Sequence, residues 1–456
     1  MNSFLMATKL RIGSVATKTA RQLLTTNAYH SCRRPQHQMQ RCLSIMASKQ
    51  SPIGRQTDTA TAADIKQKKL SLRREMVQKI TATGPMTVAE YQQMVLTHPI
   101  SGFYMKDDVF GAKGHFTTSP EISQIFGELI AVWLLNEWQR YGCPKPLRVV
   151  ELGPGRGTLA ADVGRVLSQF SHSKDVTSLH LIELSPHLTQ IQEQNICGTV
   201  SLIERNESEK DFRHSALTQT GLPITWYRSM DQIGSKPGFS AYIAHEFLDA
   251  LPVHKFVKSP SGQWREVLID CDPNGELRYI IANNATPASK MFIDGANIQS
   301  DNLEVCPQAA LIMDQVISRF SRKNPGCFLV CDYGYDDPNA NRDTFRAFRD
   351  HQMWDPLREP GTADLTADVD FGYLKKHIKD KATVFGTVTQ QHFLKSLGIE
   401  LRLSQLMGQA SDDQKADLQS GVDMLLKDMG DRYKFLSVFP ANYKETFAAI
   451  PPAGFV

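Results

Sequence analysis

The sequence predicts an α/β fold built on a doubly wound, mostly parallel sheet. Two observations predict it: short apolar runs alternate with helical stretches from residue 147 onward, and a glycine-rich loop follows the first run. Near-continuous apolar runs are typical of parallel strands covered on both faces. The predicted strands are Leu147–Leu152, Leu179–Leu184, Ile224–Tyr227, Phe239–Ala244 and Cys327–Cys331. With 456 residues, the chain can form one enlarged domain or two smaller ones.

The first 57 residues differ from the rest in charge. They hold nine of the 51 Lys and Arg residues and no Asp or Glu, so 42 basic and 48 acidic residues remain, a net charge of −6. An Arg- and Ser-rich tail without acids is typical of a mitochondrial presequence, and Arg41–Ser44 resembles a matrix-protease cleavage site. We therefore predict a presequence and linker over residues 1–57 and a location in the mitochondrial matrix; the alternative is a disordered basic arm. The acidic body disfavours nucleic acid as a partner.

Residues 64–140 are predicted to form an N-terminal helical region. Ile65–Ile80 is a charged amphipathic helix, and Thr87–Glu90 has the sequence of a capping box. Ser119 is predicted to cap a further helix, with Pro at its first turn. The apolar run Leu129–Leu135 within that helix is too short to cross a membrane, so we expect no membrane span.

The remaining domain, residues 141–456, is predicted to carry an insert at about 254–300. Within the insert, His254–Ala282 has the alternation of an antiparallel ribbon, with a turn at Asp272–Gly275. This ribbon serves either substrate docking or formation of a homodimer, and the sequence does not choose between them. Further strands are predicted at Ala382–Gln390 and Tyr433–Phe439.

The eight cysteines do not indicate a metal site. No pair has zinc-knuckle spacing, and a chain of this size does not need disulfide bonds for stability. Cys327 and Cys331 lie four apart on a predicted strand, so both point to the same face. We interpret the cysteines of the body as buried thiols and expect no metal.

The loop after the first strand has glycines at 153, 155 and 157. Glycines between a strand and a helix let the backbone approach a ligand. A Walker loop would end in Gly-Lys-Ser/Thr, and here Gly157 is followed by Thr158. A dinucleotide fingerprint would need a third glycine at 158. The observed pattern is instead E-x-G-x-G-x-G, with Glu151 two residues before the first glycine.

This pattern resembles motif I of the class I S-adenosylmethionine-dependent methyltransferases, which implies their Rossmann-like fold and their cofactor. An acid at the strand end can meet the ammonium group of S-adenosylmethionine, and the glycines leave room for its amino acid portion. An acid at the end of the next strand, Glu183, can accept both ribose hydroxyls at the crevice where open α/β sheets bind ligands. The predicted cofactor-binding residues are Glu151, Gly153, Pro154, Gly155, Gly157 and Glu183.

A polar group follows the fourth predicted strand, beside the expected methyl group. His245, Glu246 and Asp249 are predicted to be catalytic. Two carboxylates three residues apart suit a guanidinium, whose planar fork matches carboxylates and stays charged. His245 is a candidate acceptor for the proton released after methyl transfer. The alternative is that Asp249 caps a helix and His245 packs locally.

Four segments in one order resemble the MidA family of mitochondrial methyltransferases: GHFTTSPEISQIFGE, VELGPGRGTL, AHEFLDALPVHKF and PGTADLTADVDF. The resemblance runs from about Pro85 to the C-terminus. It implies a protein arginine methyltransferase that symmetrically dimethylates a core subunit of the complex I matrix arm and acts in complex I assembly. It further implies that the loop before the sheet folds over the cofactor, through Gly114, Thr118, Ser119 and Gln124. The alternative is that this loop is only a helix cap.

The last of these segments carries Asp364, Asp368 and Asp370. They are predicted either to line the acceptor channel or, for Asp368 or Asp370, to cap the helix Phe371–Ile378. Asp332 is interpreted as strand-end polarity. The alternatives for the whole chain are a nicotinamide-dependent oxidoreductase, a non-catalytic assembly scaffold, and a methyltransferase acting on RNA or a small molecule.

Overall fold

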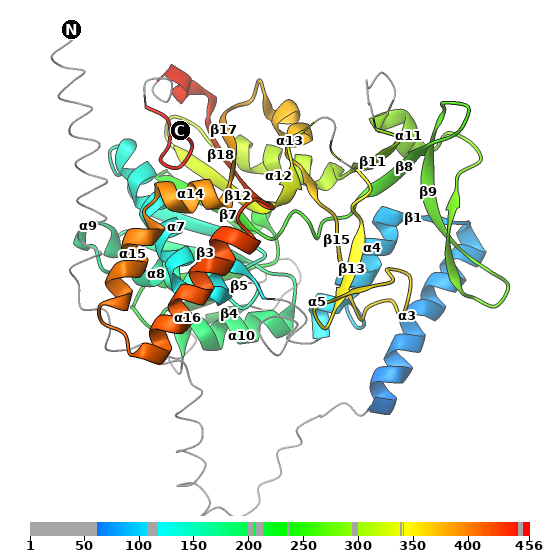
Figure 1. Ribbon diagram of the computed structural model, residues 1–456, viewed down its shortest axis with the longest axis horizontal. Coiled ribbons are helices and arrows are strands. Elements are labelled where there is room, and N and C mark those ends of the chain that lie inside the picture. The colour runs from blue at the N-terminus through cyan, green and yellow to red at the C-terminus, as the bar shows by residue number, and fades with distance from the viewer. Residues whose placement is uncertain are drawn as a thin grey trace, which may run out of the picture. The chain divides into compact units, whose positions relative to one another are not determined.

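The computed structural model describes residues 62–106, 117–198, 204–206, 213–234, 237–293, 300–337, 340, 342–445 and 450–456. The predicted presequence and Gly114 lie outside these residues. The chain divides into two compact units, Met1–Gln67 and Lys68–Val456. The second unit holds nearly all of the described residues and is drawn as a ribbon in Figure 1.

The core of this unit is a ten-stranded sheet with the order β17-β18-β12-β7-β2-β3-β6-β5-β4, in which β16 also pairs with β12. Five adjacent strands are parallel, and all five were predicted, which confirms the doubly wound α/β fold. These strands are β2 (Leu147–Leu152), β3 (Thr177–Ile182), β6 (Pro223–Tyr227), β7 (Phe239–His245) and β12 (Gly326–Tyr335). Because the strand order reverses at β2, which pairs with both β3 and β7, its carboxyl end is the topological switch point where such sheets bind ligands.

Antiparallel strands extend both edges. On one side, β18 (Tyr433–Pro440) inserts between β12 and β17 (Ala382–Thr389), and both were predicted. On the other side, β4 (Glu204–Asn206) and β5 (Arg213–Leu217) form a hairpin that was not predicted. These two strands are short and carry polar residues, so they lack the apolar runs that indicated the other strands.

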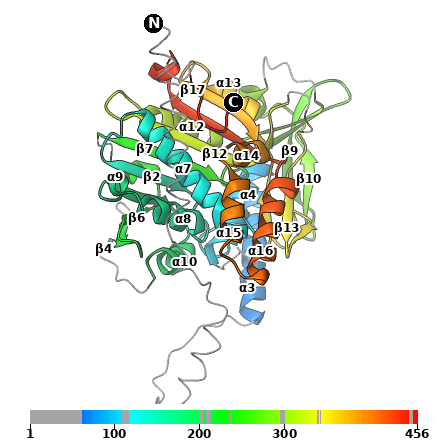
Figure 2. The ribbon, with the colours of Figure 1, turned by 60° about the vertical axis from the view of Figure 1, so that its left-hand side comes forward.

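Helices cover both faces of this sheet. On one face, α7 and α8 lie side by side, as Figure 2 shows. On the opposite face, Val150 and Leu152 of β2 share a hydrophobic core with the helices α12 and α13. Since successive side chains of a strand alternate between faces, Glu151 points away from this core. The covering helices are α7 (Gln124–Arg140), α8 (Thr158–Leu167), α10 (Pro186–Cys197), α12 (Pro307–Ser318) and α13 (Phe371–Ile378).

The helix predicted to start at Ser119 is interrupted. Thr118, not Ser119, is the N-cap of a single turn, α6 (Ser119–Ile122), and forms a capping box with Glu121. At Ser123 the backbone is extended, with φ −152° and ψ 131°, and its side chain accepts a hydrogen bond from the backbone N–H of Ile125 to start α7. The prediction that Ser119 caps a continuous helix is therefore wrong, because a second cap residue restarts the helix.

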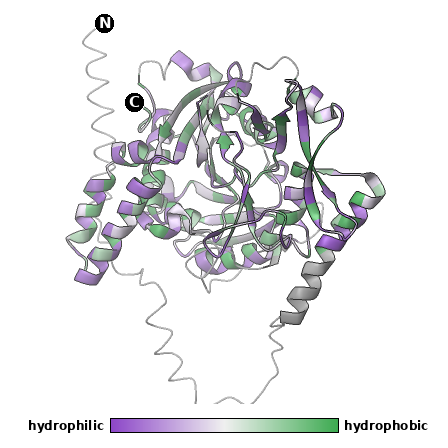
Figure 3. Ribbon diagram, turned by 45° about the vertical axis from the view of Figure 1, so that its right-hand side comes forward, coloured by the Kyte–Doolittle hydropathy of each residue, from purple (hydrophilic) through white to green (hydrophobic). Residues whose placement is uncertain are grey.

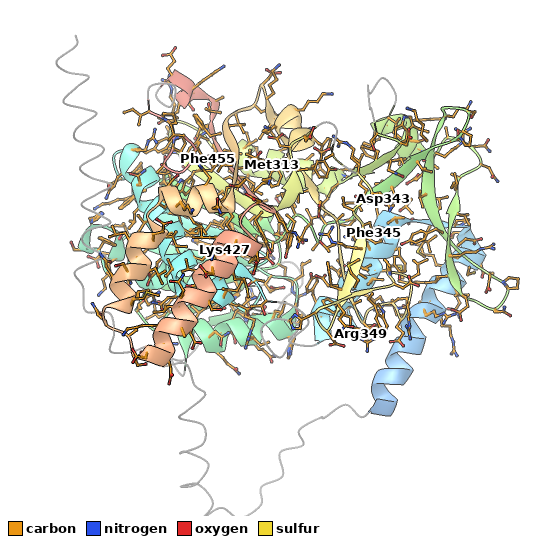
Figure 4. The ribbon with its side chains drawn as sticks, viewed as in Figure 1. Met313, Asp343, Phe345, Arg349, Lys427 and Phe455 are labelled. Atoms are coloured by element: carbon orange, nitrogen blue, oxygen red, sulfur yellow. The ribbon has the colours of Figure 1, made fainter. Side chains whose placement is uncertain are left out.

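A second hydrophobic core lies outside the main sheet. It combines residues of α3 (Ala62–Thr83) and α4 (Val88–Thr97) with residues of the ribbon and of a small sheet, β13 (Arg346–Arg349), β14 (Gln352–Trp354) and β15 (Asp364–Thr366). Phe345, which precedes β13, lies beside α4 in Figure 4. The predicted ribbon is confirmed: its strands are β8 (His254–Lys258), β9 (Trp264–Cys271) and β10 (Leu277–Ile281), joined to β1 (Met86–Thr87) and β11 (Asn302–Val305).

The C-terminal region adds helices that were not predicted from the sequence. Helices α15 (Ile399–Met407) and α16 (Asp412–Asp423) pack together, and many helices of the unit show hydrophilic and hydrophobic faces in Figure 3. Within the described ranges, no helix has the length and apolar character needed to cross a membrane. The remaining elements are α5 (Phe103–Lys106), α9 (Ser171–Lys174), α11 (Pro287–Phe292), α14 (Gln390–Ser396), β16 (Val369–Asp370) and the short turns Met230–Gln232, Met424–Asp428 and Ala441–Tyr443.

Candidate active site

A cavity of about 800 Å³ lies at the carboxyl ends of β2, β3 and β7. Its lining comes from the glycine loop, from the loop after β7, and from residues around the second core such as Tyr104 and Arg346. Ligand sites in proteins have volumes of roughly 300–1,000 Å³. The cavity therefore has room for a nucleoside cofactor together with part of a second substrate.

The glycine loop forms one wall. Gly153, Gly155 and Gly157 have φ angles of 61°, 55° and 78°, in the left-handed region that favours glycine. A Cβ added to Gly153 would lie 2.6 Å from the Phe247 ring. Gly153, Pro154 and Gly155 line the cavity, whereas Gly157 is the N-cap of α8 and faces α10. The loop thus exposes backbone to the cavity at its start and packs against a helix at its end.

Glu151 is a buried acid without a partner. Its side chain faces the cavity at the end of β2, and the residue is 5% exposed. Among the described residues, none forms an ion pair or hydrogen bond with its carboxylate. Burial raises the pKa of Glu151 to about 8. A carboxylate held in this way is matched to a cationic ligand group.

Glu183 lies at the end of β3 with its oxygens already oriented. Oε1 accepts a hydrogen bond from the backbone N–H of Ser185 at 2.7 Å, and Oε2 accepts one from Nε2 of Gln192 at 2.9 Å. Burial raises the pKa of Glu183 to about 7, although these hydrogen bonds oppose the shift. Gln192 was not predicted from the sequence. The available signal was a polar residue on the face of α10 that also carries Leu188 and Ile196.

Glu246 follows β7 in a strained conformation. Its φ of 48° is rare for a residue with a Cβ, and such strain clusters at functional sites. Its backbone N–H donates to the carbonyl of Cys331 at 3.0 Å, and its Oε1 accepts from the backbone N–H of Ser119 at 3.4 Å. Burial, and then the neighbouring Asp249, raise the pKa of Glu246 to about 8. The fold therefore gives this carboxyl group in the cavity a pKa close to neutral pH.

Asp249 and His245 complete the predicted catalytic group. Asp249 accepts a hydrogen bond from Oγ1 of Thr366 at 2.8 Å, and burial raises its pKa to about 6. No helix begins at Asp249, so the alternative that it caps one is wrong. Nε2 of His245 lies 3.5 Å from Oε1 of Glu246, and its ring packs edge-on against Phe126. Burial lowers the pKa of His245 to about 3, which keeps the imidazole neutral and makes it a weak base.

Comparison with known proteins identifies the family. A family model described as an S-adenosyl-L-methionine-dependent methyltransferase matches residues 129–388. The protein arginine methyltransferase NDUFAF7 of Xenopus tropicalis is 43% identical over 394 residues, covering 84% of this chain and 89% of that protein. The human protein of the same name is 44% identical over 375 residues, covering 80% and 83%. The chain belongs to the NDUFAF7 protein arginine methyltransferase family. All of these relatives are named as mitochondrial.

Solved structures show the same fold. Two structures of a Burkholderia thailandensis protein have TM-scores of 0.66 and 0.67, with 20% and 21% sequence identity. They cover 86% and 89% of this chain and 95% and 98% of that protein, and the first was solved with S-adenosylhomocysteine bound. A chain of the NDUFAF7 family is thus an S-adenosylmethionine-dependent methyltransferase, as predicted, and the alternative of a nicotinamide-dependent oxidoreductase is wrong.

The residues of the cavity fit this cofactor. The unpartnered Glu151 carboxylate suits an ammonium group, the loop at Gly153 and Gly155 leaves backbone accessible, and Glu183 presents a carboxylate at the strand end where ribose hydroxyls are bound. In the described parts of the chain, no group of three or more His, Cys, Asp or Glu residues is placed to hold a metal ion. Cys197, Cys327 and Cys331 are free and buried, as predicted, whereas Cys143, Cys271 and Cys306 are free but only partly buried, so the prediction of buried thiols is wrong for these three.

The segment before α7 lies at the cavity only in part. Thr118 lines the cavity, while Ser119 is fully buried and contributes its backbone N–H to Glu246. Gln124 points elsewhere: it donates to Glu128 at 3.4 Å and is absent from the cavity lining. The structure thus places Thr118 and Ser119, but not Gln124, next to the predicted site.

The three aspartates near residue 367 have different roles. Asp364 lines the cavity and accepts a hydrogen bond from the Tyr104 hydroxyl at 2.6 Å, and burial raises its pKa to about 7. Asp368 forms an ion pair with Arg346 at 2.7 Å. Asp370 is the N-cap of α13 and accepts from the backbone N–H of Tyr373, which confirms the capping alternative for this residue. Of the three, only Asp364 lines the cavity.

Asp332 has a larger role than the sequence indicated. It is fully buried, and its Oδ2 accepts hydrogen bonds from the backbone N–H groups of Phe247, Leu248 and Asp249 at 3.1, 2.9 and 3.3 Å. Three N–H groups converging on one carboxylate fix the turn that carries Glu246 and Asp249. The interpretation of Asp332 as simple strand-end polarity is therefore wrong, because the backbone of a distant loop folds around it.

Proposed function

We propose that this enzyme methylates an arginine side chain of a protein in the mitochondrial matrix. The names of its relatives support the arginine substrate and the mitochondrial location. The resemblance to the MidA family extends the proposal to symmetric dimethylation of a core subunit of the complex I matrix arm, needed for complex I assembly.

The observation that carries the proposal is the composition of the cavity. The same cavity that holds the glycine loop is also lined by the carboxyl groups of Glu246, Asp249 and Asp364. A guanidinium is planar, permanently charged and able to donate to several carboxylate oxygens at once. Three buried acids beside a methyl-donor site therefore match an arginine better than a neutral acceptor.

The buried acids can bind and orient the acceptor. The bound cofactor supplies a methyl group activated by its sulfonium centre. Glu246 and Asp249 hold the guanidinium by charge-assisted hydrogen bonds and concentrate its positive charge on the nitrogens that they contact. This orientation directs the remaining nitrogen toward the methyl group of the cofactor.

The released proton needs an acceptor in the same place. When the nitrogen forms its bond to the methyl carbon, the bond from that carbon to the sulfonium sulfur breaks, and the nitrogen carries one proton more than it does in the methylguanidinium product, which keeps a single positive charge. A base with a pKa near 8 accepts and releases protons at neutral pH, whereas one with a pKa near 3 is almost never protonated. We therefore assign the proton to Glu246 in preference to His245.

The test uses the full chain with methyl-labelled S-adenosylmethionine and unmethylated complex I subunits. Mass spectrometry of the digest is expected to show labelled dimethylarginine on one subunit. Glu246→Ala is expected to keep S-adenosylhomocysteine binding, measured by calorimetry, and to lose turnover. The matched control is Glu400→Ala, whose side chain is 72% exposed and outside the cavity.

Two outcomes would contradict the proposal. If no subunit is labelled although the cofactor is bound, the chain acts as a non-catalytic scaffold or on another acceptor. If Glu246→Ala turns over at the wild-type rate, the acceptor site lies elsewhere in the molecule.

A further inference from the structure

Helix α10 carries a fully buried amide that contacts two cofactor-binding elements. Nε2 of Gln192 donates to the carbonyl of Gly155 in the glycine loop at 2.7 Å and to Oε2 of Glu183 at 2.9 Å. Its Oε1 accepts from the indole N–H of Trp226 at 3.0 Å. Gln192 and Trp226 are both 0% exposed.

The hydrogen-bond partners fix which way this amide points. The indole N–H of Trp226 is a donor only, so it must face the amide oxygen of Gln192. The NH₂ group then faces the opposite way, and its two hydrogens match the two acceptors, Gly155 and Glu183. A reversed amide would place oxygen against oxygen at both cofactor-binding elements and would leave the indole without an acceptor.

Gln192 contacts both the glycine loop and Glu183, whereas a second amide on α10 contacts only the loop. Asn195, three residues along the helix, donates from Nδ2 to the carbonyl of Arg156 at 2.9 Å. Residues three apart on a helix share one face, so α10 holds two consecutive carbonyls of the glycine loop. Only Gln192 also reaches Glu183.

The packing of the loop allows this contact. A Cβ added to Gly157 would lie 3.2 Å from Cγ of Gln192 and 2.8 Å from Cδ1 of Ile196. A side chain at 157 would therefore push on the stem that carries the amide. This explains a glycine at a position that does not line the cavity.

We propose that Gln192 is a positioning residue for the cofactor ribose: it aims the Glu183 carboxylate and fixes the glycine loop relative to it, with Trp226 setting its orientation. The proposal concerns the cofactor and does not depend on the acceptor. The role of Gln192 can therefore be refuted while the proposed arginine substrate stands, and the arginine substrate can be refuted while the role of Gln192 stands.

The test measures ligand binding without turnover. Gln192→Met keeps the length of the side chain and removes the amide. Calorimetry on the full chain compares S-adenosylhomocysteine with its 2′,3′-dideoxy analogue, which lacks both ribose hydroxyls. S-adenosylhomocysteine should bind about 10- to 100-fold more weakly to the variant, corresponding to about 1.4–2.8 kcal/mol.

The ratio of the two affinities distinguishes positioning from general support. In the wild type, the loss of both hydroxyls should weaken binding. In Gln192→Met the ratio of the affinity for S-adenosylhomocysteine to that for the dideoxy analogue should fall toward one, because Glu183 is no longer aimed at the hydroxyls. The control Asn195→Ala removes a loop contact but leaves Glu183 in place, so it should keep the wild-type preference.

An unchanged affinity in Gln192→Met, or an equal loss for both ligands, would overturn the proposal. Thermal unfolding without ligand checks that the variant folds. Should Gln192→Met fail to fold, Trp226→Phe decides, since it removes the indole N–H that orients the amide while keeping an aromatic ring in this buried position. If Trp226→Phe keeps the wild-type preference for the ligand with hydroxyls, the proposal is rejected. A reduced preference supports it.

Discussion

Glu151→Gln tests whether the buried carboxylate at the end of β2 meets the ammonium group of the cofactor. The substitution preserves the shape of the side chain and removes its charge. Glu151 lies in the cavity with no cationic partner among the residues that the structure describes, and burial raises its pKa to about 8. Without ligand, the carboxyl group is therefore mostly protonated at pH 7.

The magnitude follows from that pKa. Ionising a group of pKa about 8 costs roughly 3 kcal/mol at pH 6 and less than about 1 kcal/mol at pH 8. A ligand that pairs with the ionised form must supply this energy at each pH. Since the difference is roughly 2 kcal/mol, the affinity should rise on the order of 30-fold between pH 6 and pH 8. Glu183, with a pKa of about 7, can add to this dependence of the affinity on pH.

The assay is calorimetric titration with S-adenosylhomocysteine at pH 6, 7 and 8, in two buffers of different ionisation heat. The wild type should release close to one proton on binding at pH 6, and its affinity should rise with pH. Glu151→Gln should bind more weakly and lose the part of the slope and of the proton release that belongs to this residue. Glu400→Gln, at the protein surface, should match the wild type.

The stability of the ligand-free protein should change with pH in the opposite direction. The folded pKa of Glu151 lies above its ordinary value of 4.5, so its contribution is fully present below about pH 4.5 and is lost as pH rises through about 8. Relative to the wild type, Glu151→Gln should therefore gain stability across this range, on the order of 4 kcal/mol by pH 8. An affinity that does not depend on pH, or a variant that binds like the wild type, would refute the reasoning.

Two further substitutions test the loops around the cavity. Asp332→Ala leaves three backbone N–H groups without their acceptor, which costs about 1–3 kcal/mol for each group. The thermal midpoint and the turnover should both fall, while S-adenosylhomocysteine still binds. An unchanged midpoint would contradict the role of this residue. Gly157→Val places a side chain against Ile196 and Gln192, so calorimetry should show loss of cofactor binding in a folded protein; retained binding would reject this account of the glycine.

The sequence by itself determined the parallel strands and the first contacts of the cofactor. Glu151 and Glu183 were found because each follows an apolar run and lies at a strand end, a pattern contained within a dozen residues. Glu246 and Asp249 were found in the same way after β7. The cofactor class also followed from local spacing, since the position of Thr158 excluded the dinucleotide pattern. Local order along the chain is sufficient for such features, because strand, loop and helix are adjacent in sequence.

The tertiary structure alone decided which distant groups support these residues. Asp332 binds a turn more than 80 residues away, Thr366 reaches Asp249 across 117 positions, and Tyr104 reaches Asp364 across 260. Alternation in a strand shows which face a side chain occupies but not what packs against that face. The pKa of Glu151 and Glu246 is likewise decided by the whole fold, because desolvation depends on every element that excludes water from the cavity.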